Sequence, residues 1–105
     1  MSNQKLLLVY ITAKDSAEAR KVAAHLLKKR LIACANIFPI SSVYRWEGKI
    51  KGGREAVLIG KTLPKHYSAI KKEVRRIHSY STPCIIKIDA EANREFSGWL
   101  RGEVK

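Results

Sequence analysis

The chain has 105 residues, 46% of them hydrophobic, a size that suits one hydrophobic core and predicts a single domain over residues 1–105. No apolar run approaches the ~18 residues of a membrane helix, and residues 1–5 are polar, so we expect no membrane contact and a cytoplasmic protein. Twenty-one Lys and Arg against nine Asp and Glu give a net charge of +12. This charge predicts attraction to anions but does not indicate whether the anion is nucleic acid, a nucleotide or an acidic membrane surface.

The chain begins with a strand and a helix. A nearly unbroken apolar run at residues 6–11 predicts a central strand covered on both faces. Asp15 suits the N-cap of a helix over residues 16–30, and Glu18 follows three positions later, as in a capping box. The outer face of this helix is basic and is most simply a solvated surface; it carries Arg20, Lys21, His25, Lys28 and Lys29.

A long hairpin follows the first helix. Residues 31–38 and 40–46 are extended, and Pro39 between them marks a bulge or a sheet edge because proline lacks an N–H for the ladder. After a turn at Glu47-Gly48 come residues 49–51, a flexible pair at Gly52 and Gly53, and then another strand over residues 55–61. Such a hairpin projects from a small core, and an isolated two-stranded ribbon is marginal in water, so we expect a partner subunit to pack against it.

The second half contains two more helices and one strand. Pro64 suits the first turn of a helix that carries an apolar stripe as far as His78. Residues 79–83 form a loop, residues 84–88 a short Ile-rich strand, and Asn93 can cap a final helix. The outer face of the helix that begins at Pro64 is again basic, with Lys65, Lys71, Lys72, Arg75 and Arg76.

The order of elements is β-α-β-β-α-β followed by a helix. This order predicts an α+β, ferredoxin-like sandwich with a four-stranded antiparallel sheet, both long helices on one face, a long hairpin and a C-terminal helix. The other sheet face is uncovered in a monomer. Because Ile37, Val57 and Ile59 cannot all point at the helices, we expect a second copy to cover that face.

Five ordered segments resemble the CutA family of divalent-cation tolerance proteins. They are residues 28–37 (KKRLIACANI), 42–50 (SVYRWEGKI), 61–62 (KT), 78–83 (HSYSTP) and 96–100 (FSGWL). The resemblance spans nearly the whole chain and implies a fold and trimeric assembly like those of the PII signalling proteins. It also implies a binding or regulatory protein linked to copper tolerance, without a defined enzymatic reaction.

The metal candidates are few. Cys34 and Cys84 lie in apolar strand-like segments without a C-x-x-C pair, which favours buried, reduced thiols. In some members of the family a Cys on the first strand and two adjacent His residues are linked to copper, and the matching positions here are Ile11, Ile77 and His78. The candidate site for Cu(II) or another divalent cation is therefore three copies of His78 at a subunit interface, or His78 with Cys34 or Cys84 of a neighbouring subunit. The alternative is that His78 caps the helix or bonds a backbone carbonyl.

A candidate ligand cleft between subunits combines aromatic, acidic and basic side chains. Its predicted members are Tyr44, Trp46, Glu47, Lys49, Lys61 and Tyr80, together with His78. Lys would bind a small anion there while the rings stack on the ligand. The alternative is that Tyr44 and Trp46 are structural anchors that dock on the next subunit.

Catalysis has little support in the sequence. There is no nucleophile elbow, P-loop or dinucleotide fingerprint, so we expect no enzyme activity. A basic nucleic-acid- or anion-binding module is the alternative function, because RNA-recognition domains share this order of elements. Residues 55–61 contain no aromatic side chain for stacking, so we expect only weak, sequence-independent nucleic-acid binding at low salt.

Overall fold

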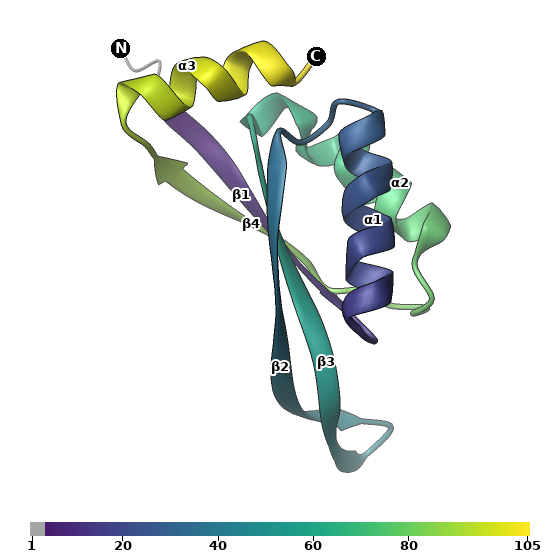
Figure 1. Ribbon diagram of the computed structural model, residues 1–105. Coiled ribbons are helices and arrows are strands. Elements are labelled where there is room, and N and C mark those ends of the chain that lie inside the picture. Colours follow the sequence, from purple (N-terminus) through teal and green to yellow (C-terminus); the bar gives the residue numbers. More distant parts are fainter. Residues whose placement is uncertain (1–3) are drawn as a thin grey trace.

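The computed structural model describes residues 4–105 as a four-stranded antiparallel sheet with three α-helices (Figure 1). In chain order the elements are β1 (Lys5–Ala13), α1 (Ser16–Lys28), β2 (Cys34–Trp46), β3 (Lys49–Thr62), η1 (Pro64–His66, a 3₁₀ turn), α2 (Tyr67–Ile77), β4 (Ile85–Glu91) and α3 (Arg94–Glu103). The strand order is β2-β3-β1-β4, and α1 and α2 lie on the same side of the sheet. The predicted ferredoxin-like fold is confirmed.

Helix α1 has a well-formed cap at each end. The Asp15 carboxylate accepts a 2.8 Å hydrogen bond from the Glu18 N–H, as predicted, but the Glu18 side chain bonds the Lys14 N–H instead of closing the box on Asp15. At the other end Arg30 adopts the left-handed conformation with φ 57°, and Leu31 N–H reaches back to the Leu26 carbonyl. This Schellman arrangement ends α1 at Lys28, two residues before the predicted boundary.

The β2–β3 hairpin keeps one register along its whole length. Pairing runs without a break from Cys34 opposite Lys61 to Trp46 opposite Lys49. Pro39 pairs with Ala56 inside this ladder, so the predicted bulge at Pro39 is wrong. The predicted sheet edge is confirmed, because β2 is the outermost strand. The two turn residues, Glu47 and Gly48, both have positive φ, as a type I′ turn requires.

The main core lies between the sheet and the α1–α2 layer. Its largest fully buried members come from β1 and β3, from α1 and α2 and from the α1–β2 connection: Leu7, Ile11, Leu26, Leu31, Ile32, Leu58 and Ile70. Ile37 packs against this core. Val57 and Ile59 alternate with the core residue Leu58 along β3, so their side chains face the other side of the sheet. This confirms the prediction that Ile37, Val57 and Ile59 do not all point at the helices.

Among residues 4–105, helix α3 covers one end of the second sheet face. There α3 packs on a smaller apolar cluster of Leu6, Leu63, Leu100 and Val104. Four large apolar side chains of β2, β4 and α3 remain 39–48% exposed: Phe38, Ile86, Ile88 and Trp99. We call these four the apolar strip. The hairpin extends well away from the helices (Figure 1), and Val43 and Ile50 near its tip are 79% and 72% exposed.

Among residues 4–105, no helix is both long enough and apolar enough to cross a membrane.

Candidate functional site at the base of the hairpin

A pocket of about 780 Å³ lies where the hairpin leaves the sheet. It is bounded by β1, by both hairpin strands and by the loop that precedes β4. Hydroxyl and aromatic groups dominate its lining, which comprises Tyr10, Thr12, Ile40, Ser41, Ser42, Val43, Tyr44, Trp46, Lys51, Glu55, Tyr80, Ser81, Thr82 and Cys84. One ammonium and one carboxylate are the charged groups in this set, so the pocket suits a polar ligand with a planar or cationic part.

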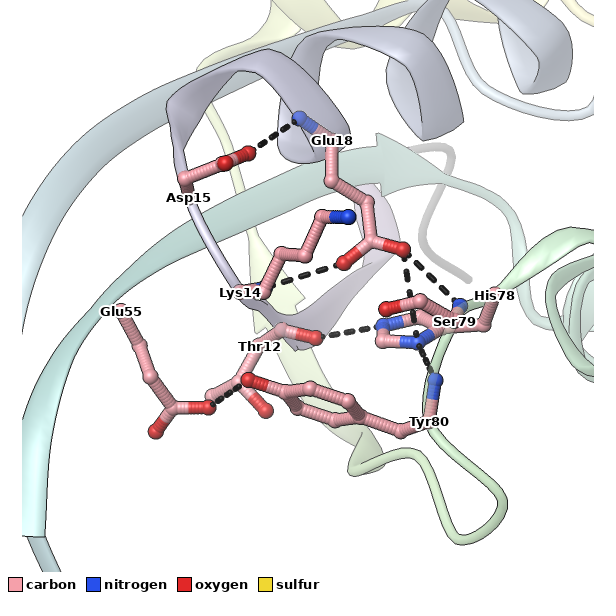
Figure 2. Close-up of polar contacts among 8 residues, drawn as sticks. All are labelled: Thr12, Lys14, Asp15, Glu18, Glu55, His78, Ser79 and Tyr80. Carbon is pink, nitrogen blue, oxygen red and sulfur yellow. Dashed lines mark hydrogen bonds and ion pairs between the residues drawn. The ribbon is translucent and has the colours of Figure 1, made fainter.

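His78 holds the loop that forms one wall of the pocket (Figure 2). Its Nε2 lies 2.7 Å from the Thr12 carbonyl, and its Nδ1 lies 3.0 Å from the Tyr80 N–H. Because a main-chain N–H can only donate, Nδ1 is the acceptor and Nε2 carries the proton. The ring is fully buried. Both nitrogens of His78 therefore serve to position the loop on β1.

Glu18 anchors the same loop from the start of α1 (Figure 2). Its carboxylate accepts 2.9 Å hydrogen bonds from the main-chain N–H groups of Lys14 and Ser79. Burial by itself raises the pKa of this carboxyl, but the hydrogen bonds from Lys14 and Ser79 outweigh it, and the pKa lies below its usual value. The buried charge thus joins β1, α1 and the loop.

Tyr80 connects the loop to the hairpin. Its hydroxyl donates a 2.6 Å hydrogen bond to the Glu55 carboxylate, and its ring lies 4.9 Å from the His78 ring. Burial is the main cause that raises the pKa of Tyr80, and the bonded Glu55 carboxylate adds to it, so the phenol stays protonated as the donor. Glu55 also lines the pocket.

The structure brings together only part of the predicted cleft. Tyr44, Trp46 and Tyr80 line the pocket, as does Cys84 of the predicted metal set. Glu47 and Lys49 lie beyond it at the hairpin tip.

Lys61 lies at the far end of β3. It is about 40 Å from Lys49 at ~3.3 Å per residue of strand, with its Nζ 5.5 Å from the centre of the Phe96 ring. Within one chain, Lys49 and Lys61 therefore cannot share one cleft.

The two cysteines also lie apart. Both thiols are free and partly buried rather than fully buried, and burial is the main cause that raises the pKa of each. Cys34 pairs with Lys61 at the start of β2, whereas Cys84 faces the pocket. Over residues 4–105 no three His, Cys, Asp or Glu side chains converge on one point, so one chain does not supply the donor set of a metal site.

The sequence did not indicate eight polar residues of the pocket: Tyr10, Thr12, Ser41, Ser42, Lys51, Glu55, Ser81 and Thr82. Two of them could have been found from the turn alone. A two-residue turn at Glu47-Gly48 places Tyr44 opposite Lys51 and Ile40 opposite Glu55. Tyr10 and Thr12 depend on the pairing of β1 with β3, which the sequence does not reveal.

Comparisons with known proteins agree with this fold. A sequence model of the family described as CutA1 divalent ion tolerance protein matches residues 7–103. The divalent-cation tolerance protein CutA of Archaeoglobus fulgidus is 45% identical over 93 residues, 88% of this chain and 91% of that protein. A solved structure named as the periplasmic divalent cation tolerance protein CutA from A. fulgidus superposes with a TM-score of 0.92 at 42% identity, covering 95% of this chain and 99% of the other.

A plant structure is equally similar in shape. CutA1 from Oryza sativa superposes with a TM-score of 0.93 at 31% identity, covering 99% of this chain and 98% of the other. Similarity of this extent, in both sequence and fold, covers the main core, the hairpin and the loop at His78. The chain belongs to the CutA family of divalent-cation tolerance proteins.

Proposed function

We propose that this protein is a homotrimeric binding protein in divalent-cation tolerance that takes a cation or a small anion in the pocket at the base of the hairpin. The observation that carries the proposal is the position of this pocket beside surfaces that one chain leaves uncovered. The proposed activity is binding without chemical turnover, in keeping with a family named for tolerance rather than for a reaction.

The apolar strip supports self-association. Phe38 and Ile88 lie on the two outer strands of the sheet, so apolar side chains are exposed to solvent at both edges of the second face. Exposed apolar surface of this kind is typical of a protein interface, and copies of one chain commonly cover it with closed symmetry. The outer edge of β2 adds unpaired main-chain groups over thirteen residues.

A neighbouring subunit would also complete the pocket. Tyr44 and Trp46 are 47% and 44% exposed beside it, which is unfavourable for aromatic rings unless a second surface or a ligand covers them. The predicted intersubunit cleft then takes Lys61 or Lys49 from another chain, since one chain cannot place both there.

Cys84 and Glu55 are the proposed cation donors of this chain. Both line the pocket, and a thiolate with a carboxylate suits copper and other transition-metal ions. Two donors fall short of the usual three or four, so the remainder would come from a neighbouring subunit or from water. In this proposal His78 acts through the loop that it positions, because its two nitrogens are already bonded to main-chain atoms.

Assembly is tested by replacing Ile88 with Asp. Light scattering of the parent is expected to give three times the 11.9 kDa chain mass, and I88D is expected to give the mass of one chain. The matched control is Lys87→Asp, on the opposite face of the same strand, which should leave the mass unchanged. A parent that stays monomeric at micromolar concentration contradicts the proposed trimer.

Cation binding is tested by calorimetry with Cu²⁺ and with redox-silent Zn²⁺. We expect Cys84→Ser to weaken binding at least tenfold and the matched control Cys34→Ser to leave it unchanged, because only Cys84 faces the pocket. His78→Ala should weaken binding less than Cys84→Ser, since it loosens the loop without removing a donor. Equal affinity in the parent and in Cys84→Ser would exclude this pocket as the cation site.

A reducing compartment fits the two free thiols, and we propose a cytoplasmic location on that ground. The solved A. fulgidus structure is named as a periplasmic protein, so a periplasmic location is the alternative for this chain. Cell fractionation with an antibody against the chain distinguishes the two, and recovery with periplasmic markers would contradict the proposal.

A further inference from the structure

Helix α2 carries a row of cations on its outer face. Lys71, Lys72, Arg75 and Arg76 line a shallow groove of about 520 Å³ together with Ser68. Within residues 4–105 an ion pair is present for only one of the four cations, Arg76, whose Nη2 lies 2.8 Å from Glu73. Glu73 is also shared with His25 of α1, at 2.7 Å, so its charge is divided among several partners. The groove therefore has a large positive excess.

This arrangement is unfavourable in the absence of an anion. Lys71 with Arg75, and Lys72 with Arg76, are like-charge pairs four residues apart, and such pairs destabilise a helix. The row from Ser68 to Arg76 spans about 12 Å at 1.5 Å per residue. An anion with several charges along that length would remove the repulsion.

The chemistry of the groove narrows the class of partner. On α2 no large apolar side chain is exposed, and on α1 Leu27 is the only exposed large apolar side chain. Within residues 4–105, the layer of α1 and α2 therefore lacks the apolar anchors of a membrane-binding helix. Single-stranded nucleic acid needs exposed aromatic rings for stacking. The one aromatic ring of α2, Tyr67, lies under the Nζ atoms of Lys71 and Lys87, at 4.9 Å and 5.3 Å.

We propose that the outer face of α2 binds the phosphate backbone of duplex nucleic acid without sequence preference. Lysine and arginine side chains supply the phosphate contacts, and attraction to the phosphate charge does not depend on base sequence. The site lies on the helical layer, whereas the pocket at the hairpin lies beside the opposite sheet face, so the two sites are independent.

The experiment compares two variants of the full-length protein that lose the same charge. K71Q/K72Q/R75Q/R76Q removes the charge of the groove, and K5Q/K14Q/R54Q/R94Q removes four exposed cations scattered over β1, the β1–α1 connection, β3 and α3. Binding to a fluorescent 20-base-pair duplex is measured by anisotropy from 50 to 200 mM salt. Circular dichroism and the oligomer mass confirm that each variant folds and assembles as the parent does.

We expect the parent to lose about a hundredfold in affinity over this salt range, because four phosphate contacts give a slope near 3.6 in log K against log salt. The groove variant should lose most of that slope and bind more than tenfold more weakly at 100 mM salt. The scattered variant should keep the parent slope within about one unit.

Three results would overturn the proposal. The first is an equal loss in both variants, which would assign the binding to net charge alone. The second is no duplex binding by the parent at 50 mM salt. The third is equally tight, groove-dependent binding of vesicles with anionic lipids or of polyglutamate, which would assign the surface to a different class of partner.

Discussion

Replacing Glu18 with Gln should destabilise the protein by about 2–4 kcal/mol. The carboxylate, 8% exposed, accepts hydrogen bonds from two main-chain N–H groups, those of Lys14 and Ser79. Glutamine has one acceptor oxygen and an NH₂ group that cannot accept, so one N–H loses its partner, at about 1–3 kcal/mol for a buried donor. The remaining bond loses its charge, and a neutral bond is roughly half as strong as an ionic one.

The destabilisation should depend on pH in a defined direction. Because the pKa of Glu18 is lower in the folded chain than in the unfolded chain, its carboxylate stabilises the fold fully above the usual Glu value of about 4.3. That contribution disappears as the pH falls through the lower, folded-state pKa. The difference between parent and Glu18→Gln should therefore be largest near neutral pH and should shrink below about pH 4.

The assay is urea unfolding at pH 7 and at lower pH values, at one fixed chain concentration because assembly would couple to stability. Glu103→Gln is the control, since that side chain is exposed near the end of α3 and its loss should change stability by less than about 0.5 kcal/mol. Unfolding midpoints for Glu18→Gln and Glu103→Gln that coincide at pH 7 would refute the role assigned to the buried carboxylate.

Three further predictions concern other polar contacts. Arg30 has a positive φ, and its side chain donates hydrogen bonds to the carbonyls of Gly102 and Glu103. Both Arg30→Ala and Arg30→Gly lose these bonds, but only Gly relieves the backbone strain, so Arg30→Ala should be less stable by about 1 kcal/mol. Equal stability of the two variants in thermal unfolding would contradict this. Burial of His66 lowers its pKa, so stability should decline as the pH falls below about 6.5, and His66→Gln should remove that decline in pH-dependent denaturation. Tyr80→Phe should cost about 1–2 kcal/mol through loss of the Glu55 bond, and a spectrophotometric titration should lose its last-ionising tyrosine; an unchanged titration would refute the raised pKa of Tyr80.

Much of the fold could be predicted because local signals and burial patterns agreed. The apolar run before Thr12, the cap at Asp15 and the stripe ending at His78 each carry their own period or terminal residue, so strand and helix positions follow from the chain alone. The hairpin register follows from the two-residue turn at Gly48, which also determines that Lys51 lies beside Tyr44. The order of these elements then leaves few topologies, and the family motifs select the same one.

The site could not be predicted in the same way, because it depends on contacts between distant segments. Pairing of β1 with β3 brings Thr12 to the pocket, and the loop before β4 brings Tyr80 to Glu55, 25 positions away in sequence. The predicted alternative for His78, a bond to a backbone carbonyl, is confirmed, but the sequence cannot reveal that the partners are the Thr12 carbonyl and the Tyr80 N–H. Residue types and periods are local properties, whereas the partners of a buried polar atom are decided only when the sheet and helices pack together.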